Sequence, residues 1–241
     1  MRASPGPMAD TDAGEMQYRA KEKDAISRGD PTTTINETCR RIKMGKIVAT
    51  EYVSLDGVVE APGGGEEFKH AGWTFEIDRG PEGDKFKLDE TLNSEALLLG
   101  RVTYEGFAAA WPSMEGEFAD RFNAMPKYVV SSTLESPEWN NSTVLKGDVV
   151  EEVSRLRRAP GGDIVVHGSP QLVQTLLEHD LIDELRMMIF PVVLGTGKRL
   201  FGETSDKKRL RLTDSKVVGD GIAILVYEPV GTEAGTADPQ R

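Results

Sequence analysis

The sequence predicts an α/β protein with a largely parallel sheet, helices on both faces and antiparallel strands at its end. Three apolar strands, at 96–99, 127–130 and 163–166, each end in small, hydroxyl-bearing or cationic residues. Strands that alternate with helices are typical of a parallel sheet, because a crossover helix returns the chain to the starting edge. The last two predicted strands, 209–218 and 222–227, are separated by three residues and predict an antiparallel hairpin.

The individual elements follow from local patterns along the chain. Apolar residues predict a first strand over 46–53, and Asp56-Gly57 predicts a tight turn after it. The glycine-rich stretch 61–82 predicts a long loop, which is the candidate for a lid. Apolar residues at helical spacing predict helices over 148–158 and 171–179. The remaining predicted elements are helices over 84–93 and 103–110 and strands over 96–99, 127–130, 163–166 and 183–194.

Composition argues against several classes of protein. The chain of 241 residues carries a net charge of −11, which disfavours nucleic acid or an anionic membrane surface as a partner. It has no run of about 18 apolar residues, and Met1 to Ala20 lack the apolar core of a secretion signal. The single cysteine, Cys39, cannot form an intrachain disulfide. We therefore expect a cytoplasmic protein.

The two ends of the chain differ from the middle. Residues 1–43 and 231–241 are polar and lack helical or strand periodicity. Such segments bury too little apolar surface to fold, so we predict a disordered N-terminal extension and a flexible C-terminal tail. The length suits one domain, which we place at residues 44–230.

Several familiar nucleotide and metal motifs do not fit the sequence. The stretch 195–198 is not a Walker A loop, because Val192 occupies the position of the leading glycine and Arg199 that of the serine or threonine. No Gly-x-Gly-x-x-Gly follows the first strand. The three histidines are far apart in sequence and no cysteine joins them, so we predict no metal site.

The turns after the predicted strands favour a phosphate group. Gly100 allows close approach of the backbone, Arg101 supplies a charge-assisted hydrogen-bonding fork, and Thr103 can cap the following helix. Helix N-termini present free N–H groups, and ligands of open α/β sheets bind beyond the carboxyl ends of the strands. The sequence therefore predicts a phosphorylated, nucleotide-like ligand at this edge.

Five segments then follow one another in a distinctive order. They are Tyr52-Val53-Ser54-Leu55-Asp56-Gly57, residues 98–105 (LLGRVTYE), residues 127–132 (KYVVSS), residues 168–172 (GSPQL) and the block from Leu181 to Phe201. Together they resemble the dihydrofolate reductase superfamily, in particular the bacterial branch related to the reductase domain of the riboflavin-biosynthesis deaminase/reductase. The resemblance covers nearly all of 46–228. It implies a dihydrofolate reductase-like three-layer fold with about eight strands, NADPH as hydride donor and often a homodimer.

The resemblance also implies cofactor contacts. Ser131 and Ser132 match the contact with the adenosine phosphate and ribose. Gly168 and Ser169 match the turn beside the pyrophosphate, where His167 replaces a glycine. The stretch 195–197 either lies next to the nicotinamide or is only a bulge. The full expected cofactor-binding set is Val53, Gly57, Gly100, Arg101, Thr103, Ser131, Ser132, His167, Gly168, Ser169, Leu172, Gly195, Thr196 and Gly197.

On the substrate side the resemblance points to Asp56. It matches an acidic residue near the substrate of the riboflavin-pathway reductases, or it is only the aspartate of an Asp-Gly turn. Dihydrofolate reductases bind the pterin through a carboxylate on the helix after the first loop. Asp84, Asp89 and Glu90 lie in that region, but none of them aligns with it, which argues against folate reduction.

We expect an NADPH-dependent reductase that transfers hydride to a small nitrogen heterocycle, pterin- or pyrimidine-like. One alternative is the reductase step of riboflavin biosynthesis, that of a 5-amino-6-(5-phosphoribosylamino)uracil reductase, without a deaminase half because its zinc motif is absent from the sequence. The other is a non-catalytic NADPH-binding module. Met187, Met188 and Phe190 predict either an apolar homodimer surface or core under a helix.

Overall fold

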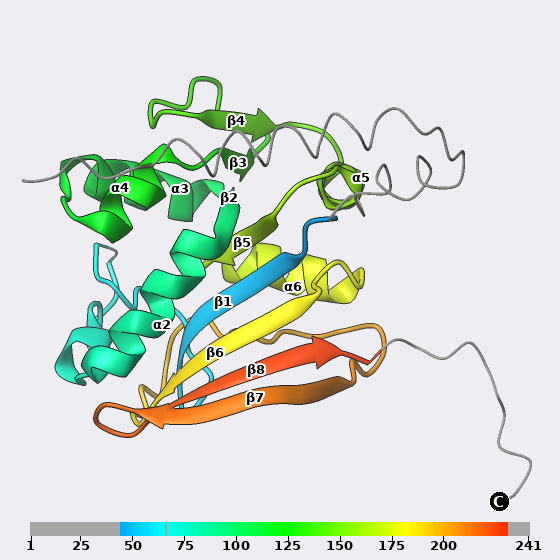
Figure 1. The fold of residues 1–241 in the computed structure, drawn as a ribbon. Helices are drawn as coiled ribbons and strands as arrows, with labels where there is room; N and C mark the ends of the chain where they lie inside the picture. Colours follow the sequence, from blue (N-terminus) through cyan, green and yellow to red (C-terminus); the bar gives the residue numbers. More distant parts are fainter. Residues whose placement is uncertain (1–43, 66, 231–241) are drawn as a thin grey trace, which may run out of the picture. The chain divides into compact units, whose positions relative to one another are not determined.

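The described residues form a three-layer α/β fold around one eight-stranded sheet (Figure 1). This computed structural model describes residues 44–65 and 67–230, so the extension predicted at 1–43 and the tail predicted at 231–241 lie outside the described residues. The strands lie in the order β4-β3-β2-β5-β1-β6-β8-β7. Their bounds are β1 Ile47–Ser54, β2 Ser94–Gly100, β3 Lys127–Val130, β4 Ser142–Leu145, β5 Asp163–His167, β6 Glu184–Phe190, β7 Leu210–Val218 and β8 Ile222–Pro229.

The sheet is mixed and mostly parallel. Each neighbouring pair from β4 to β6 is parallel, whereas β8 is antiparallel to both β6 and β7. The tight connection at 219–221 makes β7 and β8 a hairpin, as its glycines predict. The predicted fold class is confirmed.

Helices cover both faces of the sheet (Figure 1). On one face lie α5 (Val149–Arg158) and α6 (Pro170–Glu178), which bury leucines and valines against β1, β2 and β5. On the other face, α3 (Arg101–Ala110) and α4 (Glu117–Ala124) enclose aromatic side chains over β2 and β3. The helix α2 (Gly80–Asn93) lies on this second face and contacts α4. No helix within 44–65 and 67–230 is long and apolar enough to cross a bilayer.

The structure differs from the sequence predictions in several elements. The helix α4 and the strand β4 are not predicted, because α4 is short and β4 is a four-residue edge strand that begins with Ser142 and Thr143. The helix predicted over 84–93 begins at Gly80, with Pro81 in its first turn. The long loop before it contains a short 3₁₀ helix, Trp73–Glu76, and Trp73 is 2% exposed. This loop is therefore anchored to the core.

The apolar strand proposed as a dimer surface is core. Met187, Met188 and Phe190 are 8%, 1% and 1% exposed. The strand β6 lies between β1 and β8, and apolar side chains pack on both of its faces. The sequence-based argument for a surface patch is therefore wrong, and the homodimer rests on the family resemblance alone.

Candidate functional site

Two helix N-termini meet at the carboxyl edge of the sheet. The strand β2 leads into α3 on one face, and its neighbour β5 leads through Gly168 and Ser169 into α6 on the other face (Figure 1). Adjacent strands whose connections leave on opposite faces open a crevice between them, where ligands of open α/β sheets bind. The structure therefore brings together the two turns that the sequence predicts as phosphate sites.

These two turns touch through Ser169. Its Oγ accepts a hydrogen bond from the Gly100 N–H (2.8 Å) and donates one to Thr103 Oγ1 (2.8 Å). A Cβ added at Gly100 would lie 3.2 Å from Ser169 Oγ, and one at Gly168 would lie 3.4 Å from the Thr103 side chain. Both glycines keep the turns close together. Gly168 also has a φ of +59°, which glycine adopts without strain.

The first turns of α3 and α6 keep their amide groups available. The N-cap residues, Gly100 and Ser169, form no side-chain hydrogen bond to the first turn. Thr103 is the third residue of α3 and accepts from Ser169, so the expectation that it caps the helix is wrong. Free N–H groups and the positive end of each helix dipole favour an anion between the two turns.

The strand β1 extends past the end of β5 at the same edge. Their pairing runs from Ile47 opposite Ile164 to Thr50 opposite His167, whereas the pairing with β6 continues to Ser54. Residues 51–54 therefore have a strand neighbour on one side only among the described strands. On the other side, the Ser54 N–H donates to the Val58 carbonyl (3.0 Å) and the Ser54 carbonyl accepts from the Gly57 N–H (2.9 Å), so only the remaining backbone groups on this side are open to a ligand.

Asp56 ties two loops together. Its Oδ1 accepts from Ser54 Oγ (2.7 Å) and the Leu194 N–H (3.1 Å), and its Oδ2 accepts from the Gly195 N–H (2.9 Å). The Ser54 hydroxyl and these amides lower the pKa of Asp56 to about 2. Because its acceptor positions are already used by protein donors, Asp56 is suited to holding the loop rather than a substrate.

The stretch 195–197 belongs to the same pair of loops. Gly197 has a φ of +121°, and a Cβ there would lie 2.6 Å from Val58 Cγ1. The Lys198 N–H donates to Glu60 Oε2 (3.0 Å), and Leu200 N–H donates to the Gly57 carbonyl (3.0 Å). The two loops therefore form one rigid wall beside the end of β1, with Gly195 and Thr196 exposed at its tip.

The other predicted cofactor residues differ in whether their side chains are exposed or already bound within the protein. Ser131 Oγ accepts from the N–H groups of Thr133 and Leu134 and closes its own turn, while Ser132 is exposed. Arg101 is the first residue of α3 and pairs with Glu105 at 3.0 Å. Leu172 and Val53 are buried in the core.

A buried polar cluster lies between α2 and the sheet. The Lys87 ammonium donates to Thr50 Oγ1 (2.9 Å) and to Glu90, and Arg186 Nη1 donates to Glu90 Oε2 (3.1 Å). Burial acts to raise the pKa of Glu90, but neighbouring charges, chiefly that of Lys87, lower it to about 2. Desolvation lowers the pKa of His167 to about 3, so its imidazole is neutral.

Glu51, on the opposite face of β1 from Thr50 and beside Met187 of the core, is the residue that sequence reasoning missed. It is 4% exposed, and its Oε1 has no hydrogen-bond partner among the described residues. Desolvation raises its pKa to about 8. The signal in the sequence is a charged residue inside an apolar strand, together with Lys87 and Glu90 three positions apart on one helix.

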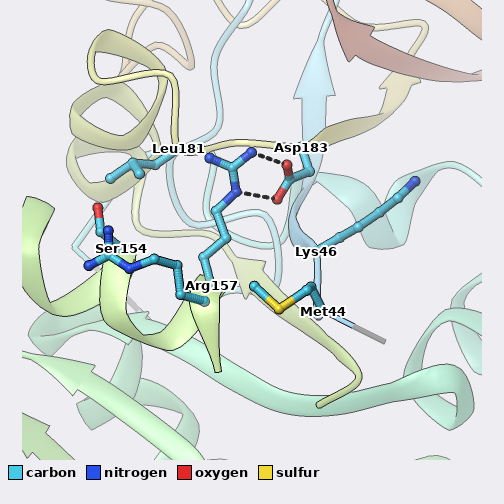
Figure 2. Close-up of a pocket in the computed structure, with 8 residues that line it drawn as sticks. Met44, Lys46, Ser154, Arg157, Leu181 and Asp183 are labelled. Carbon is cyan, nitrogen blue, oxygen red and sulfur yellow. Dashed lines mark hydrogen bonds and ion pairs between the residues drawn. The ribbon is translucent and has the colours of Figure 1, made fainter. Parts of the chain in front are cut away.

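A cavity of about 460 Å³ opens at the opposite edge of the sheet. Figure 2 shows Arg157 and Asp183 paired in it, beside Met44, Lys46, Ser154 and Leu181. None of the predicted site residues lines this cavity, and its Arg157 is already paired with Asp183. The described residues also contain no group of three or more histidine, cysteine or acidic side chains that could hold a metal ion.

Comparison with known sequences identifies relatives. The family model described as the RibD C-terminal domain matches residues 45–224. The uncharacterised proteins YyaP and YwjB of Bacillus subtilis (strain 168) are similar in sequence. YyaP is 27% identical over 192 residues, covering 77% of this chain and 96% of that protein. YwjB is 28% identical over 179 residues, covering 74% and 95%.

Solved structures share the fold. A protein from Shewanella sp. PV-4 assigned to riboflavin biosynthesis has a TM-score of 0.64 at 23% identity, covering 77% of this chain and 99% of its own. RibD of Acinetobacter baumannii has a TM-score of 0.52 at 15% identity, with 78% and 59% covered. Dihydrofolate reductase of Enterococcus faecalis, in complex with NADP(H) and RAB-propyl, has a TM-score of 0.50 at 16% identity, with 78% and 98% covered.

Proposed function

Because this chain belongs to the RibD C-terminal domain family, we propose that it is a reductase that uses NADPH to reduce a small nitrogen heterocycle. The observation that carries the proposal is the contact between the two strand-to-helix turns at Gly100 and Ser169. It places two uncapped helix N-termini side by side, which suits a dinucleotide pyrophosphate.

The residues at the edge of the sheet fit such a cofactor. The glycines at 100 and 168 leave no Cβ between the turns, and a longer side chain at either position would meet Ser169 or Thr103. The segment of β1 past the end of β5 offers backbone groups to the nicotinamide amide. Exposed Arg101 at the start of α3 would bind the 2′-phosphate that distinguishes NADPH from NADH.

When bound, NADPH supplies hydride, and the chain's own residues orient the reactants and exclude water. Tyr52 and Trp73 support the substrate side, since both rings pack edge-on against Phe190 with centroids 5.5 and 5.4 Å away. Tyr52 is also fixed by the Arg79 guanidinium, whose Nη1 donates to its hydroxyl at 2.8 Å. The acceptor ring would lie beside Tyr52 and below the loop anchored by Trp73.

Binding and turnover are tested separately. NADPH binding is measured by calorimetry on the full chain and on Thr103→Val, which keeps the size of the side chain but removes the hydroxyl that accepts from Ser169. We expect the variant to bind NADPH at least about fivefold more weakly. This loss of affinity corresponds to the free energy of one hydrogen bond. Thr213→Val on β7 is the matched control and should bind like the parent chain.

Turnover is followed as oxidation of NADPH with a panel of heterocycles. The panel contains 7,8-dihydrofolate, 5-amino-6-(5-phosphoribosylamino)uracil and simpler cyclic imines. Steady oxidation with any member supports a reductase, and the preferred member identifies the substrate class. Tight NADPH binding without oxidation across the panel would instead support a binding module. A chain that does not bind NADPH would contradict the proposal.

A further inference from the structure

The imidazole of His167 lies at the proposed site and has no hydrogen-bond partner there. His167 is the last residue of β5 and pairs with Thr50 of β1, after which the two strands separate. The residue is half-buried, and neither ring nitrogen forms a hydrogen bond or is fully enclosed within the described part of the chain. Polar atoms that the protein leaves unpaired beside a site are open to a ligand.

The sheet register gives the direction of this side chain. Val166 of β5 packs in the core beneath α5 and α6, so His167, one position further along, points to the opposite face. Its ring agrees with this direction, because it packs edge-on against Phe122 of α4 with centroids 5.3 Å apart. Thr50 points to the same face, where its hydroxyl accepts from Lys87 of α2.

Tyr52, beside which the acceptor ring is placed above, also lies on this face. It follows Thr50 by two positions on β1, and side chains two apart in a strand share a face. The Lys87 ammonium lies 2.9 Å from the Thr50 hydroxyl and 5.4 Å from the centre of the Tyr52 ring. His167 and Tyr52 are therefore diagonal neighbours on one face, close enough for both to contact one small planar ring.

His167 offers hydrogen bonds without a charge. Desolvation lowers its pKa to about 3, and the charges of Lys87 and Arg186 act in the same direction, while that of Glu90 opposes them. The neutral imidazole has one N–H donor and one acceptor nitrogen. These groups match a cyclic amide, in which a carbonyl oxygen and a ring N–H lie side by side.

We propose that His167 binds the polar edge of the heterocycle and selects substrates that contain a cyclic amide, a role that rests on the proposed function. His167 determines specificity in this role and supplies neither hydride nor a proton. The cofactor contacts expected at this turn are left to Gly168 and Ser169, which meet the turn at the start of α3.

The test variant is His167→Phe, which keeps a planar ring against Phe122 but removes both ring nitrogens. We expect it to bind NADPH within about twofold of the parent chain by calorimetry. With the preferred cyclic amide of the panel, KM should rise at least about tenfold, because the amide then lacks a partner, while kcat should stay within about threefold.

A simple cyclic imine without an amide provides the comparison. Its KM should change less than about twofold in His167→Phe, since this substrate has no polar edge to lose. A merely structural role would raise KM for both kinds of substrate alike. His179→Phe, at the exposed end of α6, is the matched control and should leave both KM values unchanged.

A ¹⁵N NMR spectrum of the chain with bound NADP⁺ gives a second readout that does not depend on turnover. The imidazole signals of His167 are identified by their loss in His167→Phe. We expect the cyclic amide to shift these signals and to leave those of His179 in place.

Four results would overturn the proposal. They are an unchanged KM for the cyclic amide, an equal rise in KM for both kinds of substrate, His167 signals that do not respond, and a loss of NADPH affinity as large as the rise in KM. A parent chain that reduces simple imines but no cyclic amide also contradicts it. Failure of the parent chain to bind NADPH or to oxidise it with any heterocycle is a different result, which removes the proposed function and this role with it.

Discussion

At the scale of single residues, Glu51 makes stability depend on pH. Its pKa rises from 4.5 to about 8 on folding because burial disfavours the charged form. Between these two values the folded chain holds a proton that the unfolded chain has lost. The contribution of Glu51 to the free energy of unfolding is therefore largest below pH 4.5, falls as pH rises, and levels off above about 8.

This dependence predicts that Glu51→Gln stabilises the protein at neutral pH. Each pH unit above 4.5 costs the parent chain about 1.4 kcal/mol, so the variant should gain about 2–4 kcal/mol at pH 7.5 relative to its difference at pH 5. Urea unfolding at the two pH values measures the gain. An equal difference at both values would show that folding does not change the protonation of Glu51.

Arg101 decides between NADPH and NADH in the proposed site. Its side chain is 45% exposed and pairs with Glu105, one helical turn further along α3. A charge-assisted hydrogen bond contributes about 1.5–3 kcal/mol, so Arg101→Ala should weaken NADPH about tenfold to a hundredfold and NADH much less. Calorimetry with both cofactors checks this, with Arg155→Ala on α5 as control. Equal losses for both cofactors would mean that Arg101 does not bind the 2′-phosphate.

At the scale of elements, the C-terminal hairpin holds the start of α2. The Asp220 N–H donates to the Asp78 carbonyl (2.8 Å), and Asp220 Oδ2 accepts from the Asp78 N–H (3.2 Å). A Cβ added at Gly219 would lie 2.1 Å from the Asp78 carbonyl oxygen. The hairpin therefore positions the helix that carries Lys87 and Glu90, although α2 and the hairpin are more than a hundred residues apart in sequence.

This contact predicts different costs for two neighbouring glycines. Gly219 and Gly221 both have positive φ, so alanine strains the backbone at either position. Only at Gly219 does the added Cβ also meet another segment, whereas nothing lies within 4 Å of it at Gly221. Gly219→Ala should therefore lower the free energy of unfolding by about 1–3 kcal/mol more than Gly221→Ala, measured in urea. Equal losses in the free energy of unfolding would show that the contact between the hairpin and the residues before α2 does not affect stability.

At the scale of the whole molecule, every part of the proposed site that the structure describes lies within 44–230. All eight strands, the paired turns and the buried cluster lie in this range. A chain trimmed to residues 44–230 should therefore keep its melting temperature within about 2 °C of the full chain, since it loses no contact of the described core. It should also keep its affinity for NADPH. Thermal unfolding measures the melting temperature, and calorimetry measures the affinity for NADPH. A large loss in either quantity would show that residues 1–43 or 231–241 contribute to it.

Several features of this protein are determined by local sequence alone. Asp148 caps α5, and its side chain accepts from the Glu151 N–H. The hairpin at 219–221 and the turn at Asp56-Gly57 follow in the same way from glycine and aspartate. Periodicity, caps and turns act between residues close in the chain, so a sequence displays them directly.

The environment of other residues depends on contacts that only the tertiary structure shows. Ser169 meets Gly100 because β2 and β5 are neighbours in the sheet, although they lie about seventy positions apart in sequence. The apolar residues of β6 are core because β1 and β8 flank that strand. Glu51 Oε1 has no hydrogen-bond partner among the described residues because its side chain shares the apolar face of β1 with Ala49 and Val53. Strand order and burial arise from contacts between distant segments, and local patterns carry no information about them.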